Sequence, residues 1–94
     1  MFSSVIIMKR KVKKVIDGDT FKTHRKVNGS DYVRLSGYNA PEKHQFGGKK
    51  ATNRLRGMIG GRTVNLSPVG KSYGRTVAKV SRNGKRISER LKKR

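Results

Sequence analysis

The sequence of 94 residues lacks cysteine and tryptophan and contains only two histidines, His24 and His44. Without cysteine the chain has no disulfide framework and no thiolate metal site. Two isolated imidazoles also argue against a histidine-rich zinc site. These absences exclude a small domain stabilised by disulfides, and they argue against a zinc-dependent protein.

Long apolar runs are absent as well. The run at residues 5–8 is too short for a membrane span or for the apolar part of a signal peptide, and no basic residue precedes it. We interpret residues 1–8 as a lead-in to the first strand and expect an intracellular location. With 94 residues and 32% apolar content, residues 1–94 are expected to form one small domain with a small core.

Acidic residues are scarce, because 5 Asp and Glu stand against 25 Lys and Arg, for a net charge of +20. Repulsion among these cations destabilises the free compact chain, and a polyanion relieves it. Nucleic acid is the favoured partner. An anionic membrane surface is the alternative, but no long amphipathic helix with a large apolar face supports it.

Alternating apolar residues and two Asn-Gly turns predict a chain that is mainly β. We expect strands over residues 9–16, 20–27, 31–37, 62–67 and 73–82. Pro68 is expected to end the fourth strand, and Tyr73 to begin the fifth on the same face as Arg75. Five strands with a helix after the third match the Greek-key barrel called the OB-fold.

Two segments are expected to be helical. The first follows the third strand, and its apolar stripe consists of Ala51, Leu55, Met58 and Ile59. Gly60 and Gly61 end it. The second is a short basic helix over residues 87–94 in which Ile87 pairs with Leu91 and Ser88 serves as the cap.

Two carboxylates lie two positions apart in Asp17-Gly18-Asp19, in a chain that has only five acids. One interpretation is a tight turn between strands, in which Gly18 supplies a positive φ. The other is a metal site, in which Asp19 binds a hard cation and Asp17 supports the site without binding the ion, either behind its ligands or through a bridging water. The local pattern leaves both interpretations open.

Four other residues carry groups suited to phosphate chemistry. Glu42 is either a surface acid paired with a lysine or a general base that activates water. Arg34 and Arg75 are either solvated charges or ligands of a phosphate. Tyr73 either fills the edge of the barrel or stacks on a base.

Three lysines are further candidates for nucleic-acid contacts. Lys49 and Lys50 begin the first helix, where they oppose the helix dipole unless a phosphate chain lies beside them. Lys71 precedes the segment that contains Tyr73. All three are otherwise solvated surface charges.

Three motifs together resemble the staphylococcal nuclease (thermonuclease) family. They are Asp-Gly-Asp-Thr at residues 17–20, Arg-Leu-Ser-Gly-Tyr-Asn-Ala-Pro-Glu at 34–42 and Tyr-Gly-Arg at 73–75. The corresponding family patterns are D-G-D-T, R-L-x-G-I-D-x-P-E and Y-G-R. The order and spacing match, and the resemblance covers roughly residues 9–91.

The resemblance implies an OB-fold nuclease that cleaves DNA and RNA with calcium. By position, Asp19 matches a metal-binding carboxylate, and Ala40 matches a residue that offers its backbone carbonyl to the metal. Arg34 and Arg75 match the arginines that bind the phosphate, and Glu42 matches the proposed general base. Tyr73 matches an aromatic residue of the family's nucleotide pocket.

Two departures from the family pattern bear on activity. Asn39 stands where the family has its second metal carboxylate, so we expect calcium to bind weakly, because affinity depends on the charge of the ligands. The resemblance also ends inside what corresponds to the family's second helix, so the C-terminal part that adds pocket residues has no counterpart in these 94 residues.

We therefore expect a nuclease of low sequence specificity that hydrolyses phosphodiester bonds by metal-assisted attack of water. The alternative is a nucleic-acid-binding protein on a nuclease-like barrel with little or no catalysis. A structural component of a ribonucleoprotein is a third class that the charge permits. Relatives of this kind are often secreted, and the oligomeric state, including a dimer, stays open.

Overall fold

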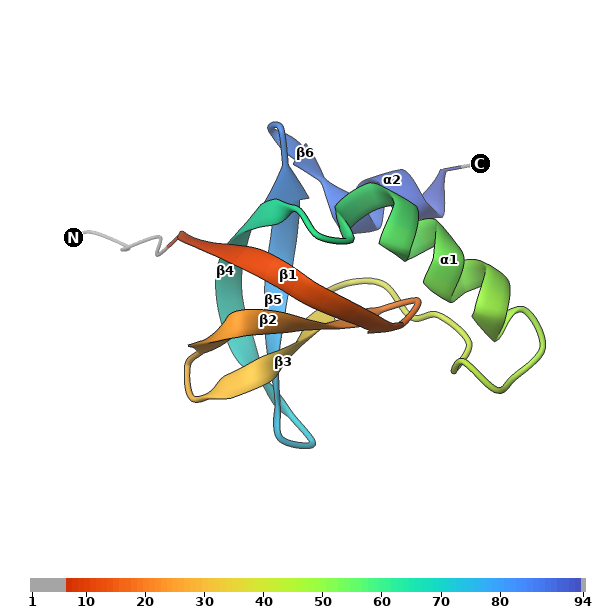
Figure 1. Cartoon of the computed structure of the whole chain (residues 1–94), viewed down its shortest axis with the longest axis horizontal. Coiled ribbons are helices and arrows are strands. Elements are labelled where there is room, and N and C mark those ends of the chain that lie inside the picture. Colours follow the sequence, from red (N-terminus) through yellow and green to blue (C-terminus); the bar gives the residue numbers. More distant parts are fainter. Residues whose placement is uncertain (1–6, 94) are drawn as a thin grey trace.

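The computed structural model describes residues 7–93, which form a β-barrel with two helices beside it (Figure 1). The elements in chain order are β1 (Met8–Asp17), β2 (Thr20–Val27), β3 (Ser30–Leu35), α1 (Gly48–Ile59), β4 (Thr63–Ser72), β5 (Arg75–Arg82), β6 (Lys85–Arg86) and α2 (Ile87–Lys92). Most of the expected lead-in lies outside the described residues. Within them, no helix has the length and apolar character needed to cross a membrane.

Strands β1 to β5 close into a barrel. The hydrogen-bonded order is β3-β2-β1-β4-β5-β6, and β3 also pairs with β5 in parallel, which joins the two ends of the five-stranded sheet. α1 follows β3, and the short α2 follows β6 (Figure 1). The expected five-stranded barrel, with one helix after the third strand and a short C-terminal helix, is confirmed.

The barrel interior is apolar because alternate residues of a strand point to the same side. Val33 and Leu35 of β3 are fully buried, and so is Phe21 of β2. Leu55 and Ile59 of α1 belong to the same core. Each such side chain stabilises the fold by about 1.5–3 kcal/mol relative to an exposed position.

The buried face of α1 differs from the prediction. Thr52 is buried beside Leu55 and Ile59, whereas Ala51 is only partly buried. The Thr52 hydroxyl donates to the carbonyl of Gly48 at 2.8 Å. This internal hydrogen bond removes most of the cost of burying a hydroxyl group.

The prediction that Pro68 ends the fourth strand is wrong, because β4 continues to Ser72. The pairing of β4 with β1 stops at Leu66, so Pro68 lies beyond the part of the strand that β1 covers. A register shift between Pro68 and Gly70 interrupts the ladder with β5. Proline lacks an N–H donor and is tolerated at such a bulge.

Tyr73 lies in a turn rather than in the fifth strand, which begins at Arg75. The φ angles of Tyr73 and Gly74 are 50° and 78°. Two consecutive positive φ angles are typical of the tight turns that match the twist of a hairpin. The turn leaves Tyr73 96% exposed, so the predicted strand face shared with Arg75 is wrong.

The end of the described chain also differs from the prediction in detail. Asn83 and Gly84 form the expected turn, with φ angles of 54° and 76°. It is followed by the two-residue strand β6, which was not predicted because both of its residues are exposed and carry no apolar alternation. No side chain caps α2, and Ser88 is buried inside that helix, so the predicted Ser88 cap is wrong.

Candidate active site

Asp19 ends the turn between β1 and β2 and is only 8% exposed. Gly18 allows this turn to lie close to its neighbours. A Cβ atom on Gly18 would lie 2.6 Å from the Cβ of Ala51 and 2.7 Å from the Cβ of Ala40. The φ of Gly18 is not in the left-handed region, so the predicted positive φ is wrong. Glycine is required here because it has no side chain.

Both carboxylate oxygens of Asp19 accept hydrogen bonds. The Thr20 hydroxyl donates to Oδ1 at 3.0 Å, and the backbone N–H of Ala40 donates to Oδ2 at 3.0 Å. An Arg34 guanidinium nitrogen, Nη2, lies 3.4 Å from Oδ2. A carboxylate with so little exposure needs these partners, because an unpaired buried charge is strongly destabilising.

Arg34 is fixed by backbone carbonyls as well as by side chains. Its Nη1 donates to the carbonyl of Leu35 at 2.7 Å and to that of Tyr38 at 3.3 Å. Its Nη2 donates to the Oδ1 of Asn39. The guanidinium therefore lies between Asp19 and Asn39, and its position is set before any ligand arrives.

Arg75 reaches the same place from β5. Its Nη1 donates to the Thr20 hydroxyl at 3.3 Å, and its Nε donates to the carbonyl of Ser72 at 3.3 Å. The Thr20 hydroxyl thus accepts from Arg75 and donates to Asp19. Strand pairing explains this meeting, because Thr20 lies opposite Arg34 and because β3 runs beside β5.

The structure therefore brings five of the predicted site residues together. We call this set the rim cluster, which consists of Asp19, Arg34, Asn39, Ala40 and Arg75. Thr20 joins it and was not predicted to take part. The sequence signal for Thr20 is a hydroxyl directly after the aspartate.

Asp17 and Glu42 lie beside the rim cluster, in a shallow cavity of their own. The Asp17 carboxylate accepts a hydrogen bond from the backbone N–H of Lys43 at 3.0 Å. Asp17, Glu42 and Lys43 all line a cavity of about 280 Å³. Among residues 7–93, no hydrogen bond or ion pair joins the Glu42 carboxylate to Asp19 or to either arginine.

The two aspartates hold the loop that carries Glu42. Asp19 binds the backbone of Ala40 and Asp17 binds the backbone of Lys43, so the anchored positions lie on either side of Glu42. Inside the loop, the N–H of Glu42 donates to the Gln45 side chain at 2.8 Å. The Glu42 side chain itself is exposed.

The other predicted contacts with nucleic acid lie outside the rim cluster. Tyr73 is in the β4–β5 turn, and Lys71 of the same hairpin donates to the carbonyl of Asn28 in the β2–β3 turn. Lys49 and Lys50 are exposed in the first turn of α1. Lys50 lines a separate cavity with Tyr38 and Arg54, among others.

The oxygens of Asp19 and Asn39 are the clearest candidates to hold a cation. Both contact the same atom, Nη2 of Arg34, so they converge on one point. Within the described part of the chain, no three Asp, Glu or His side chains are grouped as a metal site. This donor set fits a hard cation that binds weakly, because it has one carboxylate and a guanidinium already lies there.

A closed five-stranded barrel with a carboxylate and two arginines gathered at its rim defines a nuclease-like OB-fold protein. Residues 32–94 match the model of the family described as Staphylococcal nuclease homologue. The chain belongs to the staphylococcal nuclease family. A protein of Haemophilus influenzae named "Uncharacterized endonuclease" is 41% identical over 71 residues, which are 74% of this chain and 40% of that protein. The chain thus spans well under half the length of that curated relative.

Proposed function

We propose that this protein is a nuclease that hydrolyses phosphodiester bonds in DNA, RNA or both with low sequence specificity. The observation that carries the proposal is the meeting of Arg34 and Arg75 at Asp19. Arg34 contacts the carboxylate directly, and Arg75 reaches it through the Thr20 hydroxyl. Membership of the family and the net charge of +20 support a nucleic-acid substrate.

Arg34 and Arg75 are proposed to bind the non-bridging oxygens of the reacting phosphate. Guanidinium groups bind phosphate oxygens in pairs, and their charge stabilises the additional negative charge of the transition state. A phosphate bound by Arg34 would replace the contacts of its Nη2 with Asn39 and Asp19. Arg34 is held by two backbone carbonyls and Arg75 by one, so both guanidinium groups are positioned before substrate binds. This preorganisation is what makes such groups effective.

Glu42 is proposed to act as the general base that takes a proton from the attacking water. Its loop is anchored on both sides by Asp17 and Asp19, which limits where the carboxylate can move. The carboxylate is exposed and therefore accessible to water. General-base contributions of this kind are typically about 10²–10⁴-fold in rate.

Calcium is proposed as the cofactor, with Asp19, the side-chain oxygen of Asn39 and the backbone carbonyl of Ala40 as its ligands. When bound, such an ion polarises a phosphoryl oxygen as a Lewis acid. One carboxylate, a competing guanidinium and the surrounding positive charge all predict weak binding. The role of Asp17 beside the metal stays a prediction, because its carboxylate contacts the backbone of Lys43.

The proposal is tested by incubating the protein with single- and double-stranded DNA and RNA, first with calcium and then with chelator. Cleavage that requires metal and falls by about 10²–10⁴-fold in Glu42→Gln supports it. Asp31→Asn is a matched control, since Asp31 pairs with Lys22 at 3.6 Å and has no contact in the rim cluster. It should cleave at the unmodified rate.

A nucleic-acid-binding protein without catalysis is the second candidate, and Asn39 is the observation that favours it. The residue replaces a charged ligand with a neutral amide that already binds Arg34. If this alternative holds, the same samples show no cleavage with or without metal, and the protein strongly retards the nucleic acid in a native gel.

A further inference from the structure

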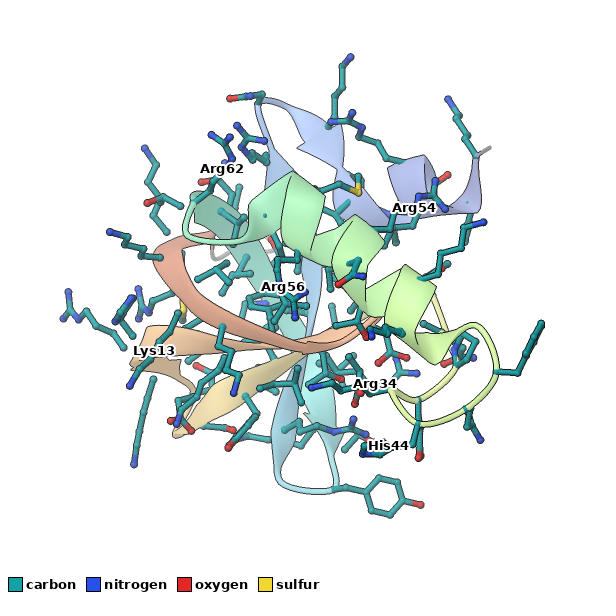
Figure 2. All side chains as sticks on the ribbon, turned by 45° about the vertical axis from the view of Figure 1, so that its right-hand side comes forward. Lys13, Arg34, His44, Arg54, Arg56 and Arg62 are labelled. Atoms are coloured by element: carbon teal, nitrogen blue, oxygen red, sulfur yellow. The ribbon has the colours of Figure 1, made fainter. Side chains whose placement is uncertain are left out.

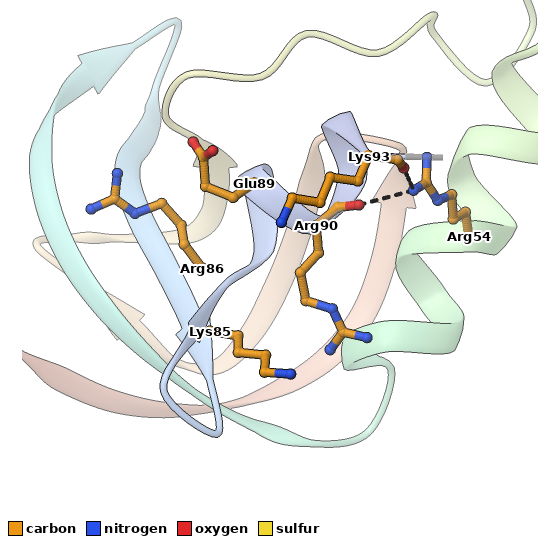
Figure 3. A pocket seen from close by; sticks show the side chains of 6 residues that line it. All are labelled: Arg54, Lys85, Arg86, Glu89, Arg90 and Lys93. Atoms are coloured by element: carbon orange, nitrogen blue, oxygen red, sulfur yellow. Dashed lines mark hydrogen bonds between the residues drawn. The ribbon is translucent and has the colours of Figure 1, made fainter.

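A cavity of about 600 Å³ lies where α1, β6 and α2 meet, away from the rim cluster (Figure 3). We call it the α2 cavity, and it is lined by Arg54, Lys85, Arg86, Glu89, Arg90 and Lys93. None of these residues belongs to the rim cluster. Figure 2 shows Arg34 and Arg54 well apart, on opposite sides of α1.

The lining of the α2 cavity is strongly cationic. Five cationic side chains stand against one carboxylate, a formal net charge of +4. That carboxylate, Glu89, already pairs with Lys92 at 3.8 Å. Within residues 7–93, no ion pair involves Lys85, Arg86, Arg90 or Lys93.

The walls of the cavity are held in place by the fold. Arg54 of α1 donates to the carbonyls of Arg90 at 3.0 Å and Lys93 at 2.5 Å (Figure 3). It also donates to the carbonyl of Leu91 at 2.7 Å. These bonds satisfy the last carbonyls of α2, which have no partner within the helix. Leu91 is buried in the barrel core. The cations therefore project from elements fixed to the core.

A concave surface whose charges all have one sign focuses the electrostatic potential and raises the local concentration of an oppositely charged ligand. The four unpaired cations come from β6, α2 and the residue after it, so they are spread around the cavity rather than focused on one point. This spread suits a chain of phosphates better than a single ion. No exposed large apolar side chain of the described residues lines the cavity, so it lacks the apolar surface by which a membrane-binding face inserts.

We propose that the α2 cavity is a second binding site for the phosphodiester backbone of nucleic acid, remote from the phosphate that reacts. The inference rests on the proposed nucleic-acid substrate but not on catalysis. It predicts that long strands bind more tightly than short ones, because only a long strand reaches both the α2 cavity and the rim cluster.

The test compares the triple variant Lys85→Gln, Arg90→Gln and Lys93→Gln with the unmodified protein. All three residues are exposed, so the substitutions remove charge without opening the core. Binding of labelled single-stranded oligonucleotides of about 4 and about 30 nucleotides is measured by fluorescence anisotropy in chelator, over a range of salt. Because the anisotropy measures binding and does not require cleavage, failure of this inference and failure of the proposed nuclease are distinguishable.

A matched control removes three exposed lysines from the barrel, with Lys11→Gln, Lys13→Gln and Lys26→Gln. Figure 2 shows Lys13 on the side of the molecule away from Arg54. The cavity variant should lose at least tenfold more affinity for the long strand than for the short one. Its salt slope should fall by about 2, since each phosphate contact on a single strand contributes about 0.7. The control variant should change the slope by less than half of that.

Equal losses in the cavity and control variants would mean that total charge alone sets affinity, and would overturn the inference. A second result would also overturn it. The unmodified protein would bind tightly to vesicles of phosphatidylserine and phosphatidylcholine, and the cavity variant would lose this binding but keep its affinity for the long strand. Circular dichroism and a thermal melt of each variant establish that it is folded. The single variant Arg90→Gln, which should lower the slope by about 0.7, provides an independent check.

Discussion

Asn39 is the residue of the rim cluster that bears most directly on the proposed calcium site. Its Oδ1 accepts a hydrogen bond from Nη2 of Arg34, the same nitrogen that lies 3.4 Å from Asp19. A neutral amide supplies an oxygen ligand without negative charge, and calcium affinity rises with the number of charged ligands. Two side-chain oxygens therefore converge on one point, but only the one from Asp19 carries a negative charge.

We predict that Asn39→Asp raises calcium affinity by about tenfold or more, because a second carboxylate is added within reach of the same point. Isothermal titration calorimetry with calcium measures the change. Asn83→Asp is a matched control, since it adds the same charge at an exposed turn far along the chain. An equal gain in both variants would show that net charge matters and that Asn39 does not face the ion.

Single residues of the site were predictable where a motif specified them. Asp19, Arg34 and Arg75 were chosen from the three motifs, and the structure places them together. The link through Thr20 was not predicted, because it depends on the register that sets Thr20 opposite Arg34. The contact of Asp17 with the backbone of Lys43 was also missed, since local sequence does not reveal where a loop returns.

The β1–β2 turn is the element on which the site depends. Gly18 allows it to lie against α1 and against the loop after β3, with Ala51 and Ala40 as its neighbours. Asp17 at the end of β1 and Asp19 in the turn supply the carboxylates that anchor that loop. Packing and site geometry are therefore coupled through one glycine.

Gly18→Ala is expected to destabilise the fold by about 1–3 kcal/mol, because the new methyl group would overlap the methyl groups of Ala51 and Ala40. For a domain of this size that lowers the thermal midpoint by roughly 4–8 °C for each kcal/mol. Gly57→Ala is expected to have the opposite effect and to raise the thermal midpoint. A Cβ there meets nothing within 4 Å, and alanine stabilises a helix interior by roughly 0.5–1 kcal/mol. Midpoints that move in the same direction would contradict this account of Gly18.

Elements were predictable where local chemistry and tertiary pairing agree. The hairpin turn at Asn28-Gly29 has the expected positive φ angles of 49° and 85°. Pro68 and Tyr73 were assigned wrongly because their environment is set by neighbouring strands. Pro68 lies beyond the reach of β1, and Tyr73 adopts a left-handed conformation that alternation cannot reveal.

The molecule as a whole carries a net charge of +20 on 94 residues. Only three ion pairs are formed among residues 7–93, so most of the cations are not neutralised by the protein itself. The resulting repulsion opposes the compact state, and bound phosphates or screening salt reduce it. Stability and nucleic-acid binding are therefore linked.

We expect a single-stranded oligonucleotide, added in chelator at about 100 times its Kd, to stabilise the protein by about 2.7 kcal/mol. This corresponds to a rise of roughly 10–20 °C in the thermal midpoint. Differential scanning fluorimetry at low salt measures it, with an uncharged polymer as control. A rise of the same size in 1 M salt would contradict the electrostatic origin, because such salt screens charges beyond about 3 Å.

The central claim is that the rim cluster binds and stabilises the phosphate that reacts. Its most direct test is the kcat/KM for cleavage of a DNA oligonucleotide by Arg34→Lys and Arg75→Lys, with Arg25→Lys as the matched control at an exposed position of β2. Lysine keeps the charge but not the paired donors. Each rim variant is predicted to lose about 10²–10³-fold, as when a preorganised donor is removed, while the control stays within about twofold. Equal rates for all three variants, each shown to be folded, would contradict the claim.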